Sequence, residues 1–200
     1  MPTTFQRLVK RTWRPPINVD MFPDDCDKHH KPWKSTIYQT CYSPKSDQQW
    51  DLLINNIYTA KLARFRIYRE QGEDPKHILI ITDNLKLDAC SDLNTLDGHT
   101  IEAASQYYCD VVDEPLQMTA SLTPDHKIFL LADEDVLQDL DSGVLKVVQA
   151  APSGNDPECY FQWMRLESIF LIDFCVDLEN SDYGLWDFIW EEQPGALYTG

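Results

Sequence analysis

The longest periodic pattern in the chain runs over residues 46–72. Apolar side chains recur there at steps of three and four residues, which places them on one face of an α-helix; they are Trp50, Leu53, Ile54, Ile57, Tyr58, Leu62, Phe65 and Tyr68. Ser46 and Gln49 have the spacing of a capping box, and Gly72 and Pro75 interrupt the pattern. We therefore predict one long amphipathic helix that begins at Ser46 and ends near Gly72.

Short runs rich in β-branched and aromatic residues predict strands at 35–42, 77–83, 126–133, 144–150 and 159–167. A second amphipathic helix is expected over 100–112, and Asp133 has the place of an N-cap before a short helix that ends at Gly143. Residues 84–98 have the composition of a loop with a helical turn. Residues 168–178 fit either a strand or a helix, because a run this short has no decisive period.

The order of these segments predicts an α+β fold with one mostly antiparallel sheet of about five strands and its helices packed on one face. Residues 35–200 are expected to form this single domain. Residues 1–34 are expected to form a basic, Pro-rich N-terminal arm. Residues 1–14 are basic and include Phe5, Leu8 and Trp13, so they also fit a targeting segment.

Charge is distributed unevenly along the chain, whose formal net charge is −16. Residues 77–200 contain 24 Asp and Glu against four Lys and Arg. Such a surface repels the phosphates of nucleic acids and of anionic lipids, and it favours a basic protein as partner. No apolar run is long enough to span a bilayer. We therefore expect a protein that binds neither nucleic acid nor membrane.

Six cysteines are scattered at positions 26, 41, 90, 109, 159 and 175, without a C-x-x-C pair. In a chain long enough to bury a sizeable core, this pattern is typical of reduced thiols inside the cell. We expect a cytoplasmic or nuclear monomer that holds no cofactor.

Several short motifs follow one another in order: YQTCY at 38–42, QQWDLL at 48–53, TDN at 82–84 before LDG at 96–98, IFLLADEDVL at 128–137, and WMRLE at 163–167 before an aromatic C-terminal segment. In these motifs, and over about residues 36–198, the chain resembles a group of proteins from filamentous fungi for which no function is established. The resemblance implies an intracellular globular protein and a helix over 168–178. It implies no catalytic residue and no ligand.

The segment DDCDKHHKPW at 24–33 has the residue types of a metal site. Cys26, His29 and His30 are zinc ligand types, and Cys41 would supply a fourth ligand. However, adjacent histidines point in opposite directions in an extended chain, no short ligand pair follows, and three lysines in or beside the segment oppose a cation. We predict a polar surface loop anchored by Trp33, without structural zinc.

Two further groups of side chains are candidates for a site. Acidic residues and a histidine suit acid–base chemistry or a hard cation, although their spacing is not that of an EF-hand loop; they are Asp83, Asp88, Asp92, Asp97 and His99. Aromatic residues near the C-terminus would line a pocket or a partner groove if they converge; they are Trp163, Trp186, Phe188 and Trp190. The first group is equally explained as turn and cap residues, and the second as core.

The sequence has no nucleophile elbow, no catalytic cysteine motif and no phosphate-binding glycine loop. Two hypotheses follow. The first is a non-enzymatic intracellular protein that binds another macromolecule through its acidic face. The alternative is an accessory enzyme or small-molecule binder in fungal specialised metabolism. A flat acidic face favours the first, and a partly apolar pocket with two or more titratable residues favours the second.

Overall fold

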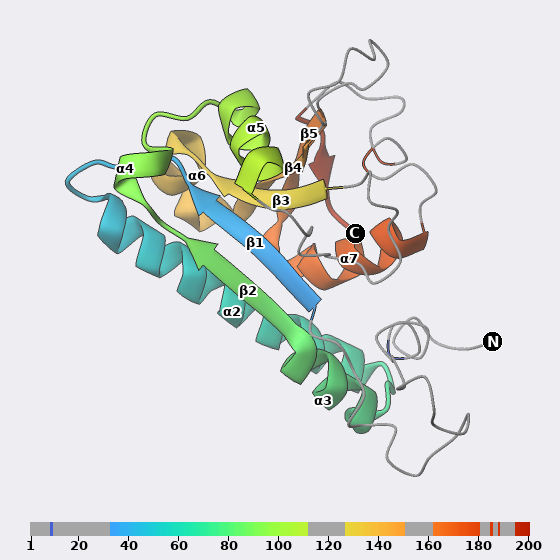
Figure 1. Ribbon diagram of the computed structural model, residues 1–200. Helices are drawn as coiled ribbons and strands as arrows, with labels where there is room; N and C mark the ends of the chain where they lie inside the picture. Colours follow the sequence, from blue (N-terminus) through green and yellow to red (C-terminus); the bar gives the residue numbers. More distant parts are fainter. Residues whose placement is uncertain are drawn as a thin grey trace.

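The computed structural model describes Val9 and residues 33–111, 127–150, 162–180, 185, 188 and 195–200. Within these residues one mixed sheet is flanked by helices on both faces (Figure 1). The elements in chain order are β1 (Trp33–Gln39), α2 (Ser46–Glu70), α3 (Pro75–Asn84), β2 (Leu85–Cys90), α4 (Leu93–Leu96), α5 (Ile101–Val111), β3 (Lys127–Ala132), α6 (Glu134–Gln138), η2 (Leu140–Ser142), β4 (Val144–Ala150), β5 (Gln162–Glu167), η3 (Ser168–Phe170), α7 (Leu171–Asn180) and β6 (Leu197–Tyr198).

The sheet has the strand order β2-β1-β3-β4-β5-β6. Strands β2, β1 and β3 are parallel, β4 is antiparallel to both β3 and β5, and β6 runs parallel to β5. The connections from β1 to β2 and from β2 to β3 contain helices, which return the chain to the edge of the sheet where the previous strand began. The α+β class is therefore confirmed, but the sheet is mixed and has six strands, where we expected about five, mostly antiparallel.

Apolar side chains cover both faces of the sheet. Helices α2 and α7 pack on one face around a cluster that includes Ile37, Leu53 and Phe174. Helix α5 packs on the other face, where Tyr108 stacks on Phe129 with ring centroids 4.9 Å apart. The prediction of helices on one face was wrong, because the central strands have apolar residues on both sides of the pleat and each side must be buried.

Helix α2 confirms the longest predicted helix, and its buried residues are Ser46, Trp50, Leu53, Ile57, Phe65 and Tyr68. The predicted capping box does not form. The Ser46 hydroxyl instead exchanges hydrogen bonds with the backbone of Ser43, and the Gln49 side chain donates to the carbonyl oxygen of Leu137, 2.9 Å away. A tertiary contact with α6 therefore uses the side chain that the local pattern assigned to the helix end.

Two segments between α2 and α5 differ from the prediction. Residues 77–83, expected to be a strand, belong to α3, in which Asp74 caps the N-terminus by accepting a hydrogen bond from the amide of Lys76. An N-cap Asp followed by Pro75 at the first helical position favours a helix. Within the stretch expected to be a loop, residues 85–90 form β2, which pairs with β1 along its whole length.

The predicted strands at 35–42, 126–133, 144–150 and 159–167 correspond to β1, β3, β4 and β5, and the predicted helix at 100–112 corresponds to α5. Residues 112, 126 and 159–161 lie outside the described residues. Asp133 caps α6 by accepting a hydrogen bond from the amide of Val136, and Gly143 ends η2 with a φ of 64°. Residues 168–178 are helical, as η3 and most of α7. In the described part of the chain, no helix has both the length and the apolar character needed to cross a membrane. The arm predicted over residues 1–34, with its targeting segment at 1–14, lies outside the described residues apart from Val9 and residues 33–34, and the last two belong to β1.

Candidate functional site

The parallel strands end together at one edge of the sheet, which we call the carboxyl edge. The chain leaves β1 toward β2 and later returns to β3, on the other side of β1. Sheets with such a reversal between neighbouring parallel strands usually bind ligands outside the carboxyl ends of those strands. The starts of α2, α5, α6 and β4 also lie at this edge, so side chains from several elements can form a site there.

A buried lysine lies at this edge between two carboxylates of α6 and its N-cap. The ammonium group of Lys146, on β4, donates hydrogen bonds to Asp133 and to Asp135, and the Lys146–Asp135 distance is 2.8 Å. The Lys146 side chain is 9% exposed, whereas Asp135 is 84% exposed. The Nζ atom of Lys146 also lies 5.4 Å from the centre of the Trp163 ring on β5. The strand therefore holds one cation against two anions and an aromatic face.

The electrostatics of this group keep Lys146 charged. Burial by itself would lower the pKa of Lys146, but its hydrogen bonds to Asp133 and Asp135 outweigh burial and raise the pKa above its ordinary value. The same hydrogen bond, from Lys146, lowers the pKa of Asp135. A lysine with a raised pKa is a poor base and a poor amine nucleophile, because both roles require the neutral form. Lys146 is suited to electrostatic stabilisation and not to covalent chemistry.

A pocket of about 200 Å³ opens beside this lysine, and its lining residues are Asp135, Val136, Asp139, Ser142, Val144, Lys146 and Arg165. The Arg165 Nε donates to the carbonyl oxygen of Gly195 at 2.8 Å, and no described carboxylate lies within ion-pair distance of Arg165. The remaining donors of Arg165 can bind a carboxylate or phosphate group, and Asp139 can bind a cation. The pocket thus presents both signs of charge beside two valines.

Cysteine chemistry at the carboxyl edge is disfavoured. Cys41 follows β1, and its thiol pKa is raised, first by burial and then by the charges of Glu134, Asp97 and Asp133. Cys90, at the end of β2, has a pKa raised by burial and by Asp88. The reactive form of cysteine is the thiolate. Both thiols are therefore held in the unreactive form.

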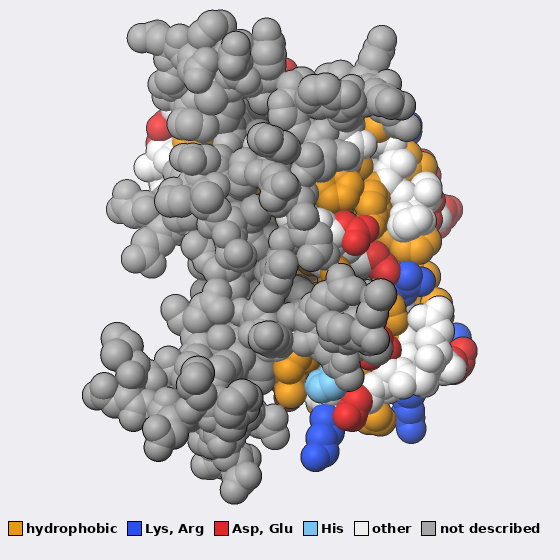
Figure 2. Space-filling view, turned by 90° about the vertical axis from the view of Figure 1, so that its right-hand side faces the viewer, with side chains coloured by type: hydrophobic (Ala, Val, Ile, Leu, Met, Phe, Trp, Pro, Cys, Tyr) orange, Lys and Arg blue, Asp and Glu red, His pale blue; other side chains and the backbone are white. Residues whose placement is uncertain are grey.

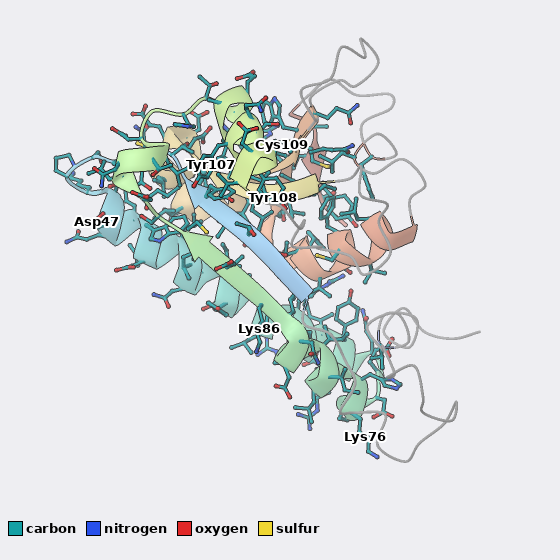
Figure 3. All side chains as sticks on the ribbon, in the orientation of Figure 1. Asp47, Lys76, Lys86, Tyr107, Tyr108 and Cys109 are labelled. Carbon is teal, nitrogen blue, oxygen red and sulfur yellow. The ribbon has the colours of Figure 1, made fainter. Side chains whose placement is uncertain are left out.

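The balance of charge differs between the two ends of the strands. Carboxylates predominate at the carboxyl edge, where the cations among the described residues are Lys45, Lys146 and Arg165. We call the surface formed by the carboxylates at this end the acidic edge. Its residues are Asp47, Asp51, Asp92, Asp97, Glu102, Asp133, Glu134, Asp135, Asp139, Asp141 and Glu167. The segment from the end of α2 through α3 to the start of β2 provides Arg66, Arg69, Lys76 and Lys86, and also Glu70, Glu73, Asp74 and Asp83, so both signs of charge are mixed at that end. Figure 3 shows Asp47 and Lys76 far apart, with Lys86 between them.

The acidic residues predicted as a group do not converge. Asp83 lies at the end of α3, before β2, and was wrongly expected to follow a strand. Asp97 and His99 lie beyond the other end of β2, which separates them from Asp83 by six strand residues, roughly 20 Å. Asp88 lies between these ends, within β2. Across the described residues, no three His, Cys, Asp or Glu side chains form a group that could hold a metal ion.

The predicted aromatic cluster is also divided. Trp163 packs with the α5 side of the sheet, whereas Phe188 packs with the α7 side, against Phe174 and Tyr198. The side chains of Trp186 and Trp190 lie outside the described residues. Figure 2 shows the side of the molecule that lies to the right in Figure 1. On its described part, hydrophobic, acidic and basic side chains are intermixed.

The zinc hypothesis concerns Cys26, His29 and His30, which also lie outside the described residues, so the prediction that they bind no zinc stays a prediction. Their proposed fourth ligand, Cys41, lies just beyond β1 with a partly buried thiol.

The sequence reasoning missed the group formed by Asp133, Asp135, Lys146 and Arg165. One signal was available: Lys146 is the only charged residue in the apolar run VLKVVQA, and a lysine in a buried strand requires a carboxylate partner. Arg165 enters the pocket only through the pairing of β4 with β5, which places it opposite Lys146. No protein family, curated protein or solved structure matches the sequence.

Proposed function

We propose that this chain is a non-enzymatic protein-binding module whose acidic edge docks on a basic surface of another protein. The observation that supports this most directly is the excess of carboxylates at one end of the sheet, where eleven described Asp and Glu residues accompany three cations. Asp97, Glu102 and Asp141 are exposed, and no described cation forms an ion pair with them. Unpaired exposed charge of one sign steers a partner of opposite sign and sets its orientation.

The ionisation of the neighbouring groups supports binding over catalysis. Lys146 has a raised pKa, and so do Cys41 and Cys90. Each shift stabilises the form of the side chain that is less reactive as a nucleophile or base. The acidic edge therefore supplies charge and shape, while its potential nucleophiles are kept protonated.

The test is capture of partners from native lysate by the full chain at low and at high salt, followed by affinity measurement with the purified partner. The variant Asp97→Asn with Asp141→Asn removes two charges from the acidic edge. Glu70→Gln with Asp83→Asn is the matched control, because it removes the same charge at the other end of the strands. We expect a basic partner that is retained at low salt, released at high salt and lost only with the first variant. Equal loss with both variants, or binding that salt does not weaken, would contradict the proposal.

The pocket beside Lys146 supports a second candidate function, the binding of a small molecule with both an acidic and a basic group. Arg165 would bind the acidic group and Asp139 the basic group. A thermal-shift screen with small amphoteric metabolites tests this candidate. A ligand that stabilises the wild-type chain but not Arg165→Gln or Asp139→Asn would support it, and a screen without such a ligand would count against it.

A further inference from the structure

Strand β2 forms the rim of the sheet. It is the first strand in the spatial order, and β1 is the only described strand that pairs with it. Figure 1 shows β2 at the outer edge of the sheet, with no other strand beyond it. Every second backbone amide and carbonyl of an edge strand points away from the sheet, and such a row readily pairs with another strand. Among the described residues no strand pairs with this outer edge, so an added strand can pair there; the Leu85 carbonyl oxygen accepts a hydrogen bond from Lys61 Nζ, 3.1 Å away.

The side chains of β2 carry a charge pattern that can specify the added strand. Lys86 and Asp88 are both exposed and, being two residues apart, project to the same face of the sheet. Neither has an ion-pair partner among the described residues. Leu85 and Leu87 project to the opposite face, where they join the cluster beneath α2. The exposed face of β2 therefore presents one cation and one anion at neighbouring positions of the same strand, and each would face a side chain of an added strand.

We propose that a second copy of this chain pairs with β2 through its own β2, antiparallel and related by a two-fold axis at Leu87. In this register Lys86 of each copy lies directly opposite Asp88 of the other copy. A two-fold axis at Lys86 would oppose two lysines, and an axis at Asp88 would oppose two aspartates. Opposite charges in directly facing positions stabilise an antiparallel pair, and like charges destabilise it. The sequence of β2 thus selects one of three neighbouring registers.

Helix α2 adds an apolar surface beside the same edge. Tyr58 is 44% exposed and Leu62, one turn further along, is 61% exposed. Tyr58 lines a small hollow together with Leu85 and Leu87, which places this side of α2 next to β2. The two-fold axis brings both copies of α2 to the same face of the joined sheet, on either side of the new strand pair. The second copy would therefore cover apolar side chains as well as the free strand edge.

This proposal differs from the monomer expected from the sequence. It uses the side of the sheet, whereas the proposed partner site uses the carboxyl edge, so the two proposals do not depend on each other. The dimer would contain one continuous sheet with two acidic edges that point in opposite directions, because the two copies of β2 are antiparallel.

Sedimentation velocity of the full chain over a concentration series tests the proposal by a charge exchange. The wild-type chain should show a monomer–dimer equilibrium. Lys86→Asp places two aspartates opposite each other at both symmetric positions, and Asp88→Lys does the same with lysines. Each should raise the dimer dissociation constant by roughly tenfold or more. The double variant Lys86→Asp with Asp88→Lys restores opposite charges in this register and should return the dissociation constant to near the wild-type value.

Lys76→Asp is the matched control, since it makes the same charge change on an exposed residue of α3 and should leave the dimer unchanged. Circular dichroism and thermal unfolding show whether each variant is folded, and the double variant provides a readout even where a single variant is unstable. Wild-type chain that is monomeric at every concentration would overturn the proposal. A dimer that neither single variant weakens, or that the double variant fails to restore, would overturn it as well.

Discussion

Asp133 has two structural roles that substitution can separate. It caps α6 by accepting a hydrogen bond from the amide of Val136, and it accepts a hydrogen bond from the buried ammonium group of Lys146. Asp133→Asn keeps a side-chain oxygen for the cap and removes the charge. Asp133→Ala removes both. The difference between these two variants therefore measures the cap, and the effect of Asn measures the charge.

The structure sets the expected magnitudes. Loss of one partner from a fully buried ion pair costs about 3–5 kcal/mol. Asp133 is 21% exposed and Asp135 remains as a second partner for Lys146, so we expect Asp133→Asn to lower the free energy of unfolding by about 1–3 kcal/mol. Loss of the cap adds about 1 kcal/mol. Asp133→Ala should therefore cost about 2–4 kcal/mol in total.

Urea unfolding with linear extrapolation measures these values. Asp139→Asn, a nearby exposed carboxylate without a described ion pair, is the control and should change stability by no more than about 0.5 kcal/mol. Lys146→Met keeps most of the stem that packs by Trp163, and a double-mutant cycle of Asp133→Asn with Lys146→Met isolates the pair. If Asp133→Asn behaves like Asp139→Asn, or if the cycle gives no coupling, the reasoning about this buried pair is refuted.

Three other predictions concern stability. Trp50→Ala should lower the free energy of unfolding by about 3–5 kcal/mol because the ring is buried, whereas Leu52→Ala, on the exposed side of the same helix, should be nearly neutral in the same urea assay. Burial raises the pKa of Tyr108 from 10.0 to about 12, so its neutral form stabilises the fold at lower pH; this contribution should be lost as pH rises from about 10 to 12, and Tyr108→Phe should show a shallower alkaline loss in a pH series of thermal melts. Gly195→Ala should destabilise by roughly 1–2 kcal/mol, because φ is 93° and the new Cβ would lie 2.9 Å from the Trp163 ring; unchanged urea stability would contradict this.

Local patterns in the sequence were sufficient where a segment's own side chains decide its structure. The three- and four-residue period of α2 could be predicted because a stripe of apolar residues is stable only as a helix with one buried side. The same holds for the cap at Asp133, whose hydrogen bond is made three residues along the chain. The apolar run at 128–132 could be recognised as a strand because it is short and is followed by this helix start.

The tertiary structure decided the features that depend on distant residues. Residues 78–81 are apolar enough for a strand or a helix, and packing of Ile78 and Ile81 beneath the sheet accompanies the helical choice. Strand β2 alternates too briefly to be distinguished from a loop until β1 supplies its partner. Parallel pairing, helices on both faces and the group of Asp133, Lys146 and Arg165 depend on the order, direction and register of the strands in the sheet. Strand order depends on the combined burial of both sheet faces, which no single segment of the sequence specifies.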